Sequence, residues 1–490
     1  MRRILLLLCL GLAGGAIAAP QEHDPAAAVE VNLEADLAHL SLRQVEIVRI
    51  LIRAAQIMDE LYRQQVAPDG FYPADMGRHE FEAWADPAAA SPHTRVRRDP
   101  QGRLEAVPYH EAWPVALGRA ARLLARAAEL TTDETLRHYL TLRARALITG
   151  GHTRADAAWA VVRYSEIDVL IGPIGLDADR EFGLKAGFGA YILLRDWAWG
   201  ARLARFTVFL PKMQHDLPVS AAFKSEVPNV DLKLGVYDLL YQAGAGAARA
   251  VPVGPEMAGD PRVRLENGPR RLQLRNVMRA RYDKLVLPVA DTLIVPEQRA
   301  AASFETFFLN TMLHEMAHSL GMSMTIDGRS TVSAALREHA DTIEEAKAAV
   351  LSLWIVDWLH ARGELPDTTR TAHYVSFLAS VLRTIQLDAH NPVGQARLLL
   401  FNYFRDWGAF RRDADSGLYR IDEADMGRAI EALAAHVLTI QGSGDYAGAA
   451  GLIESMAVMR HGFRADLDRL AAAGIPAKLV FRQGEDLLGL

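Results

Sequence analysis

Two histidines and a glutamate between Ser303 and Gly321 have the types and spacing of a metal site. The apolar residues of this stretch recur at helical spacing, so we expect a helix that carries His314 and His318 four residues apart on one face. Two imidazoles one turn apart can bind one tetrahedral zinc ion, and Glu315 beside them can take a proton from a metal-bound water. The alternative is a chance HExxH pentapeptide on a buried helix.

The position of the third ligand decides the class of enzyme. A metzincin would carry a third histidine where this chain has Met324, so that class is excluded. Apolar periodicity then predicts one continuous helix from Val332 to Arg362, ended by a glycine. On this helix Glu338, Asp341 and Glu345 share a face, where like charges repel unless water or a cation relieves them. The alternative is a solvated acidic stripe, but the histidine pair upstream favours a metal ligand among the three carboxylates.

The strings HEMAHSLG, from His314, and IEEAKA, from Ile343, together resemble the dipeptidyl peptidase III family of zinc exopeptidases, in particular its bacterial members with an HExxH pentapeptide. The similarity covers nearly the whole mature chain, including FYPADM, SEIDVLIGPIG, EFGLKAGFGAYI and FNYFRDWGAF. The resemblance implies that the second glutamate of the EE pair, Glu345, binds zinc with His314 and His318. It also implies two lobes with a wide cleft between them, a lower lobe with a small β-barrel and a helical upper lobe that carries the zinc.

Several positions depart from what the resemblance implies for substrate binding. Gly175 and Asp177 stand where family members have a glutamate, which holds the free amino terminus of the substrate, and a tyrosine. Asp177 or Asp179 could supply a carboxylate instead. Pro252 and Pro255 replace two asparagines that bind the peptide backbone, and proline has no side-chain amide.

Other departures lie closer to the metal. Val393 replaces a histidine, for which His390 could substitute, whereas Arg397 matches an arginine of some members and is a candidate substrate-binding residue. Ala349 replaces an acid, four residues after the glutamate ligand, that would orient a zinc-bound histidine, and Asp341 could serve in its place. Loss of such support typically costs about 10- to 100-fold in metal affinity or activity.

These observations predict a zinc metallopeptidase with one Zn²⁺ per chain, Glu315 as the catalytic base and small peptides as substrates. Three hypotheses stay open: a peptidase with altered substrate preference, a strict dipeptidyl aminopeptidase, and a weak or inactive family member that binds peptides or regulates in the periplasm. We favour the first, because HExxH with a glutamate is sufficient to activate water, whereas Gly175 offers no carboxylate to a charged amine.

Composition and the first residues limit where the protein works. Residues 1–18 combine two arginines, an apolar run and a small-residue cleavage site, so they predict a signal peptide and a periplasmic or secreted protein. Cys9, the only cysteine, lies in that segment, which excludes thiolate ligands from the mature chain. The net charge of −6, without a basic stripe, argues against nucleic acid. No later apolar run reaches the roughly 18 residues of a membrane span, and the oligomeric state is left open, with a monomer favoured.

The element pattern predicts an α+β fold that is predominantly helical. Its strands lack regular βαβ spacing, so we expect a small mixed sheet or barrel in the lower lobe. Residues 19–278 should form mostly the lower lobe, and residues 279–490 mostly the helical upper lobe with the zinc site. The expected helices are 42–65, 112–130 and 133–149, the expected strands are 165–172, 206–210, 230–240, 271–274 and 293–295, and a loop with one hairpin is expected at 67–108.

Overall fold

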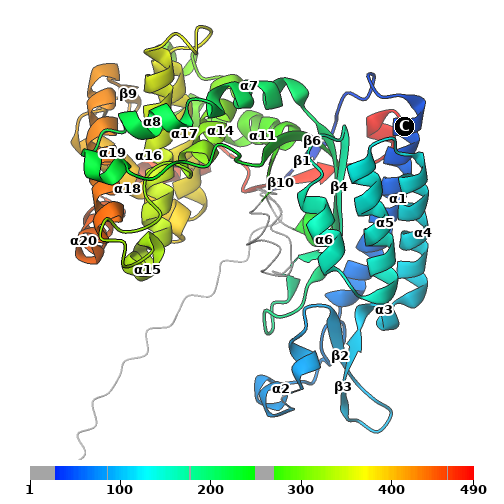
Figure 1. The fold of residues 1–490 in the computed structure, drawn as a ribbon. Coiled ribbons are helices and arrows are strands. Elements are labelled where there is room, and N and C mark those ends of the chain that lie inside the picture. The colour runs from blue at the N-terminus through cyan, green and yellow to red at the C-terminus, as the bar shows by residue number, and fades with distance from the viewer. Residues whose placement is uncertain (1–27, 85, 176–177, 249–269, 461) are drawn as a thin grey trace, which may run out of the picture.

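The protein has an α+β fold of two lobes, each with its own hydrophobic core (Figure 1). The computed structural model describes residues 28–84, 86–175, 178–248, 270–460 and 462–490. The predicted signal peptide and the candidate residues Asp177, Pro252 and Pro255 lie outside the described residues. Within those ranges, no helix combines the length and the apolar character that a membrane crossing requires.

A four-stranded mixed sheet forms the centre of the first lobe. Its order is β4 (Ile167–Gly175), β5 (Gly187–Arg195), β6 (Leu234–Gly244) and β7 (Arg271–Leu274), antiparallel except for the parallel pair β6 and β7. The first three strands are almost wholly buried, which explains their continuous apolar runs. The predicted mixed sheet is confirmed, and its described strands do not close into a barrel.

Long helices cover this sheet, and they match the predicted helices closely. Helix α1 (Leu42–Gln65) packs on β4, β5 and β6, and α4 (Pro114–Leu130), α5 (Glu134–Thr149) and α6 (Thr153–Ala160) continue the layer (Figure 1). The α1 helix begins at a capping box, in which the Ser41 hydroxyl accepts a hydrogen bond from a backbone N–H three residues on. The predicted hairpin is also present, as β2 (Thr94–Arg98) and β3 (Leu104–Pro108).

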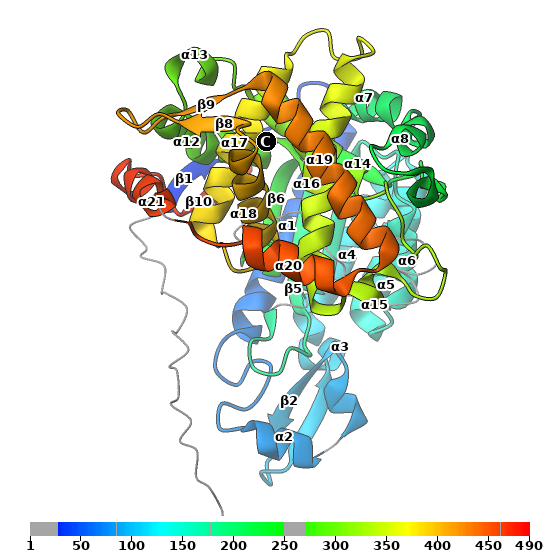
Figure 2. The same ribbon diagram turned by 90° about the vertical axis from the view of Figure 1, so that its left-hand side faces the viewer.

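The second lobe is a helical bundle around α16 (Ala340–His360). Sixteen of the 21 residues of α16 are buried, as expected for a helix that is surrounded by others. The helices α14 (Phe304–Ala317), α17 (Arg370–Leu387), α18 (Pro392–Asp406) and α19 (Glu423–Ser443) pack against it. Figure 2 shows this bundle from the outside, with α19 in front of α16.

Shorter elements connect or flank the two lobes. The remaining helices are α2 (Arg78–Trp84), α3 (Tyr109–Ala112), α7 (Trp197–Thr207), α8 (Leu210–Asp216), α9 (Ala245–Ala248), α11 (Arg275–Arg281), α12 (Leu287–Leu293), α13 (Pro296–Arg299), α15 (Val332–Leu336), α20 (Tyr446–Met456) and α21 (Phe463–Ala472). The remaining strands are β1 (Ala28–Asn32), β8 (Phe410–Arg412), β9 (Tyr419–Ile421) and β10 (Lys478–Arg482). Short 3₁₀ helices are formed by Pro87–Ala90, Ala221–Lys224, Arg337–His339 and Asp486–Leu488. One turn of π-helix is formed by Tyr282–Val286.

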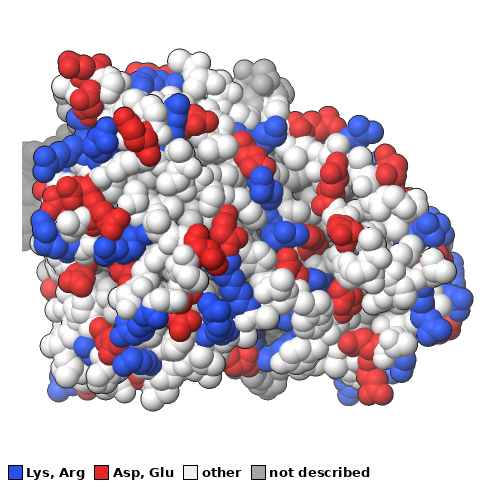
Figure 3. Space-filling model, turned by 90° about the horizontal axis from the view of Figure 1, so that it is seen from above, with Lys and Arg blue, Asp and Glu red and all other residues white. Residues whose placement is uncertain are grey.

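The chain passes between the lobes more than once. Helices α7 and α8 precede β6 in the chain, but their buried residues belong to the second core. Strand β1 pairs in parallel with β10, and Leu488 packs in the first core. The domain boundary predicted between residues 278 and 279 stays a prediction. Seen from above, acidic and basic side chains are interspersed over the surface (Figure 3).

Two predicted strands are wrong. Residues 206–210 instead end α7 and begin α8, and each helix buries its own apolar residue, Phe206 or Leu210, in the second core. Residues 293–295 form no strand, since only Ile294 makes an isolated bridge, to Tyr419. The predictions at 165–172, 230–240 and 271–274 correspond to β4, β6 and β7, whereas β5 was not predicted.

The predicted continuous helix from Val332 to Arg362 is also wrong. It is divided into α15, a tight turn at Arg337–His339, and α16. The break occurs at Arg337, which has φ of 53°, a conformation that a helix cannot contain. Glu338 therefore leaves the acidic face, and its carboxylate accepts a hydrogen bond from the Tyr446 hydroxyl at 2.6 Å.

Candidate metal centre

Helix α14 presents the two histidines from its last turn. The helix begins at Ser303, whose hydroxyl accepts a hydrogen bond from the Thr306 N–H, and its buried residues pack in the second core. His314 lies in the last turn and His318 caps the end, with the two ring centroids 4.8 Å apart. The predicted one-turn spacing therefore places both rings side by side at the end of the helix.

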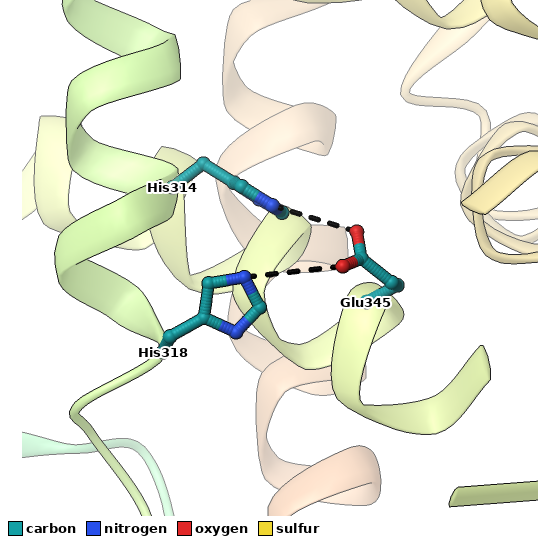
Figure 4. A group of neighbouring side chains, drawn as sticks. All are labelled: His314, His318 and Glu345. Atoms are coloured by element: carbon teal, nitrogen blue, oxygen red, sulfur yellow. Dashed lines mark ion pairs between the residues drawn. The ribbon is translucent and has the colours of Figure 1, made fainter. Parts of the chain in front are cut away.

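Glu345 approaches the two rings from α16, as Figure 4 shows. Its Oε2 lies 3.5 Å from His314 Nε2, and its Oε1 lies 3.9 Å from His318 Nε2. One ligand atom from each residue falls within 4.8 Å of the others, and no other group of this kind occurs among the described residues. Ligands about 2.1 Å from a tetrahedral zinc lie about 3.4 Å from one another, so the three residues could hold such an ion.

The charge states of these residues suit a cation. Burial would raise the pKa of Glu345, but hydrogen bonding from His314 and the nearby charges lower that pKa to about 2. Burial lowers the pKa of His314, which favours the neutral imidazole that metals bind. The three side chains stay 15%, 16% and 24% exposed, so one side of the group is open to water.

Glu344 orients His318, a contact that the sequence interpretation missed. Its Oε1 lies 2.8 Å from His318 Nδ1 and 2.9 Å from Lys347 Nζ, and its Oε2 accepts a hydrogen bond from Gln441 at 2.9 Å. Partial burial opposes the charged form of Glu344, but the charge of Lys347 and these hydrogen bonds outweigh it and lower its pKa. Glu344 thus takes the orienting role considered for Asp341, which is exposed on the wall of a pocket of about 480 Å³ beside His318.

His314 lacks an equivalent partner. Its Nδ1 is shielded from solvent and has no hydrogen-bond partner among the described residues. Ala349, at the position where the sequence lacks an acid, is fully buried in α16 and brings no polar group to the ring. The two imidazoles therefore differ, since His318 is held by a carboxylate and His314 is not.

Glu315 contacts the first lobe through β7. Its Oε1 accepts a hydrogen bond from Gln273 Nε2 at 3.3 Å, its Oε2 lies 3.6 Å from Arg271 Nη1, and its backbone carbonyl accepts from the same guanidinium at 3.0 Å. Because side chains two apart in a strand point the same way, the pair from β7 reaches one carboxylate. These contacts hold Glu315 at the junction of the lobes.

Two solved dipeptidyl peptidase III structures match this fold over almost its whole length. The enzyme from Caldithrix abyssi is 30% identical, with a TM-score of 0.83, over 94% of this chain and 98% of that one. The chain belongs to the dipeptidyl peptidase III family. The enzyme from Corallococcus sp. strain EGB is 28% identical, with a TM-score of 0.70, over 93% of this chain and 95% of that one. The family resemblance read from the motifs is thus confirmed.

A curated relative carries a different name. The chain is 29% identical over 440 residues to Nudix hydrolase 3 of Arabidopsis thaliana, and the match covers 84% of this chain. The chain spans only 56% of that longer protein, so the name Nudix hydrolase 3 belongs to a protein with a large part that this chain lacks. No family model matches the chain.

The structure gives a reason for the missing amine-binding glutamate of the dipeptidyl peptidase III family at Gly175. A Cβ added there would lie 2.4 Å from the Ala245 Cβ, so the strand leaves no room for a side chain. Asp179, proposed as a substitute, accepts a hydrogen bond from the Tyr72 hydroxyl at 2.7 Å and from four backbone N–H groups. Its oxygens are therefore used within the lobe.

The other predicted substrate residues lie on or near α18. Val393 is exposed, and the exposed His390 donates its backbone N–H to Asp388. Arg397 is partly buried and, with His314, lines a small cavity behind the metal centre. Its assignment to substrate binding stays a prediction.

Proposed function

We propose that the protein is a zinc-dependent peptide hydrolase in which His314, His318 and Glu345 hold the ion and Glu315 is the general base. The observation that carries this proposal is the convergence of two imidazoles and one carboxylate, from different helices, within 4.8 Å. When bound, zinc supplies Lewis-acid chemistry and lowers the pKa of a bound water toward about 7. The open side of the group leaves space for a substrate.

The chain's own residues then perform the proton transfers. Glu315 takes a proton from the attacking water and delivers it to the leaving amine of the cleaved peptide bond. Arg271 and Gln273 fix its carboxylate through the contacts with β7. Glu344 holds His318 in one orientation, which keeps its Nε2 directed at Glu345 and the ion.

We propose that the substrates are small peptides and that strict release of dipeptides from free amino termini is relaxed. Gly175 supplies no carboxylate for the substrate's amine, and Asp179 is engaged elsewhere. The same observation favours a second candidate, a periplasmic protein that binds peptides without turnover. The predicted signal peptide supports a periplasmic or secreted location for either candidate.

Zinc analysis combined with a peptide library separates these functions. We expect about one zinc per chain, cleavage of peptides with free or acetylated amino termini, and loss of cleavage in Glu315→Gln with zinc retained. Zinc with release of dipeptides only from free amino termini would indicate a strict dipeptidyl peptidase. Binding of peptides without any cleavage would support the second candidate, and unchanged cleavage by Glu315→Gln would refute the proposed base.

A further inference from the structure

Two buried hydrogen-bond donors face one small cavity behind the metal centre. The cavity, of about 80 Å³, lies where α14, α16, α17 and α18 meet, and its lining includes His314, Ser352, Ser380 and Arg397. His314 Nδ1 and Arg397 Nη1 are both shielded from solvent and have no hydrogen-bond partner among the described residues. Buried polar groups are normally paired, so the two atoms require an explanation.

Both atoms require an acceptor of hydrogen bonds. A guanidinium offers donors only, and an imidazole whose Nε2 faces a metal carries its proton on Nδ1. Arg397 has no ion pair with a described carboxylate. The negative charge of Glu345 acts on Arg397, but both Glu345 oxygens point at the Nε2 atoms of the two histidines. The shielded Nη1 side of the partly buried guanidinium has no counter-charge beside it, and a neutral acceptor would leave the positive charge on that side uncompensated.

We propose that a small inorganic anion of halide size, such as chloride, binds in this cavity between His314 Nδ1 and Arg397 Nη1. The inference rests on the proposed metal function, because the metal fixes the proton on Nδ1. The anion performs for His314 what the carboxylate of Glu344 performs for His318. It orients the imidazole, and it neutralises the guanidinium.

The nearby Ala349 makes the proposal testable from within the chain. It is fully buried on α16, one turn after Glu345, and its carbonyl accepts a hydrogen bond from the cavity residue Ser352. A glutamate at this position would bring a permanent carboxylate to the site. A leucine would fill space there without providing an acceptor, and is the matched control.

Bromide gives the most direct test, because it resembles chloride and scatters X-rays anomalously. We expect crystals of the wild-type chain grown in sodium bromide to show an anomalous peak within hydrogen-bond distance of His314 Nδ1 and Arg397 Nη1. A cavity that contains only water, with no anomalous peak, would overturn the proposal. This test needs no variant and does not depend on activity.

Zinc affinity, measured by competition with a chromophoric chelator, tests the role in solution. At equal ionic strength, we expect wild type to bind zinc about 10-fold more tightly in sodium chloride than in sodium benzenesulfonate, whose anion is too large for the cavity. Ala349→Glu should bind zinc tightly in both salts, and Arg397→Met weakly in both. Ala349→Leu should bind zinc weakly in sodium benzenesulfonate, as wild type does.

The outcomes distinguish this proposal from the proposed function. Equal zinc affinity of wild type in both salts would overturn the anion site and leave the metal centre intact. A chloride effect that persists in Arg397→Met would show that chloride binds elsewhere, and would also overturn it. Wild type that binds no zinc in either salt would refute the metal centre itself, and the bromide experiment would still decide whether the cavity takes an anion.

Discussion

Replacing Glu344 by glutamine should weaken zinc binding although Glu344 is not a ligand. The carboxylate accepts from His318 and Gln441 and pairs with Lys347, all at 2.8 to 2.9 Å. A glutamine offers only one oxygen and would direct an N–H₂ group at another donor. Loss of such an orienting partner typically costs about 10- to 100-fold in metal affinity, or about 1.4 to 2.7 kcal/mol.

The same change should lower the stability of the zinc-free protein. Lys347 is 3% exposed and would lose its carboxylate, but Glu344 itself is 37% exposed, so water can replace part of the interaction. We therefore expect about 1 to 2 kcal/mol, below the full cost of breaking a buried pair. Urea unfolding measures this loss, and chelator competition measures the zinc affinity.

Asp341→Asn is the matched control for this prediction. It removes the same charge three residues earlier on α16, but from an exposed side chain, so zinc affinity and stability should stay close to those of wild type. The reasoning is refuted if Glu344→Gln binds zinc as tightly as wild type. It is equally refuted if Asp341→Asn weakens zinc binding as much as Glu344→Gln does.

Three further predictions concern other parts of the molecule. Glu345→Ala should lose stoichiometric zinc and the zinc-dependent rise in Tm, and a calorimetric rise equal to that of wild type would contradict the ligand assignment. Burial raises the pKa of Asp357 from 3.8 to about 6, so the folded protein favours its protonated form. The stability that this protonation contributes is fully present below pH 3.8 and is lost as the pH rises through about 6. Asp357→Asn should therefore be more stable than wild type by about 1 to 3 kcal/mol in urea unfolding at pH 8, with no gain near pH 4, and an equal gain at both pH values would exclude this cause. Gly175→Ala should lower the free energy of unfolding in urea by about 1 to 3 kcal/mol, because the new methyl group would clash with the buried Ala245 methyl. The control Gly200→Ala adds a methyl in open space on α7 and should raise the free energy of unfolding by up to about 1 kcal/mol. Equal effects of the two changes would show that the close contact of Gly175 with Ala245 is unimportant.

Local patterns in the sequence predicted the parts of the fold that depend on neighbouring residues. The bounds of α1 and the presence of the helix that carries His314 and His318 follow from apolar spacing. The break at Arg337 was not predictable in this way, because a positive φ at an arginine depends on tertiary contacts. Strand β5 was missed because glycines occupy two of its first three positions and leave only a short apolar run, residues 190–194.

The same distinction applies to the metal centre. His314 and His318 follow from helical spacing, and Glu345 follows from an acidic face together with the family motif. The residues that support them come from distant parts of the chain: Gln441 lies on α19, and Arg271 lies on β7 in the other lobe. No local pattern relates such positions, so these contacts required the folded structure, and the catalytic and metal-binding roles stay predictions.

The pairing of β1 with β10 affects how the protein folds while it is being synthesised. Each residue of β1 has its partner 450 positions later, as Ala28 has Lys478. During synthesis this strand has no pairing partner until nearly all of the second lobe has been translated. The last strand pairing of the fold is therefore a late, long-range one. Shortening the chain before Lys478 would leave β1 without any strand partner, and such an unpaired strand can pair with another copy of the chain.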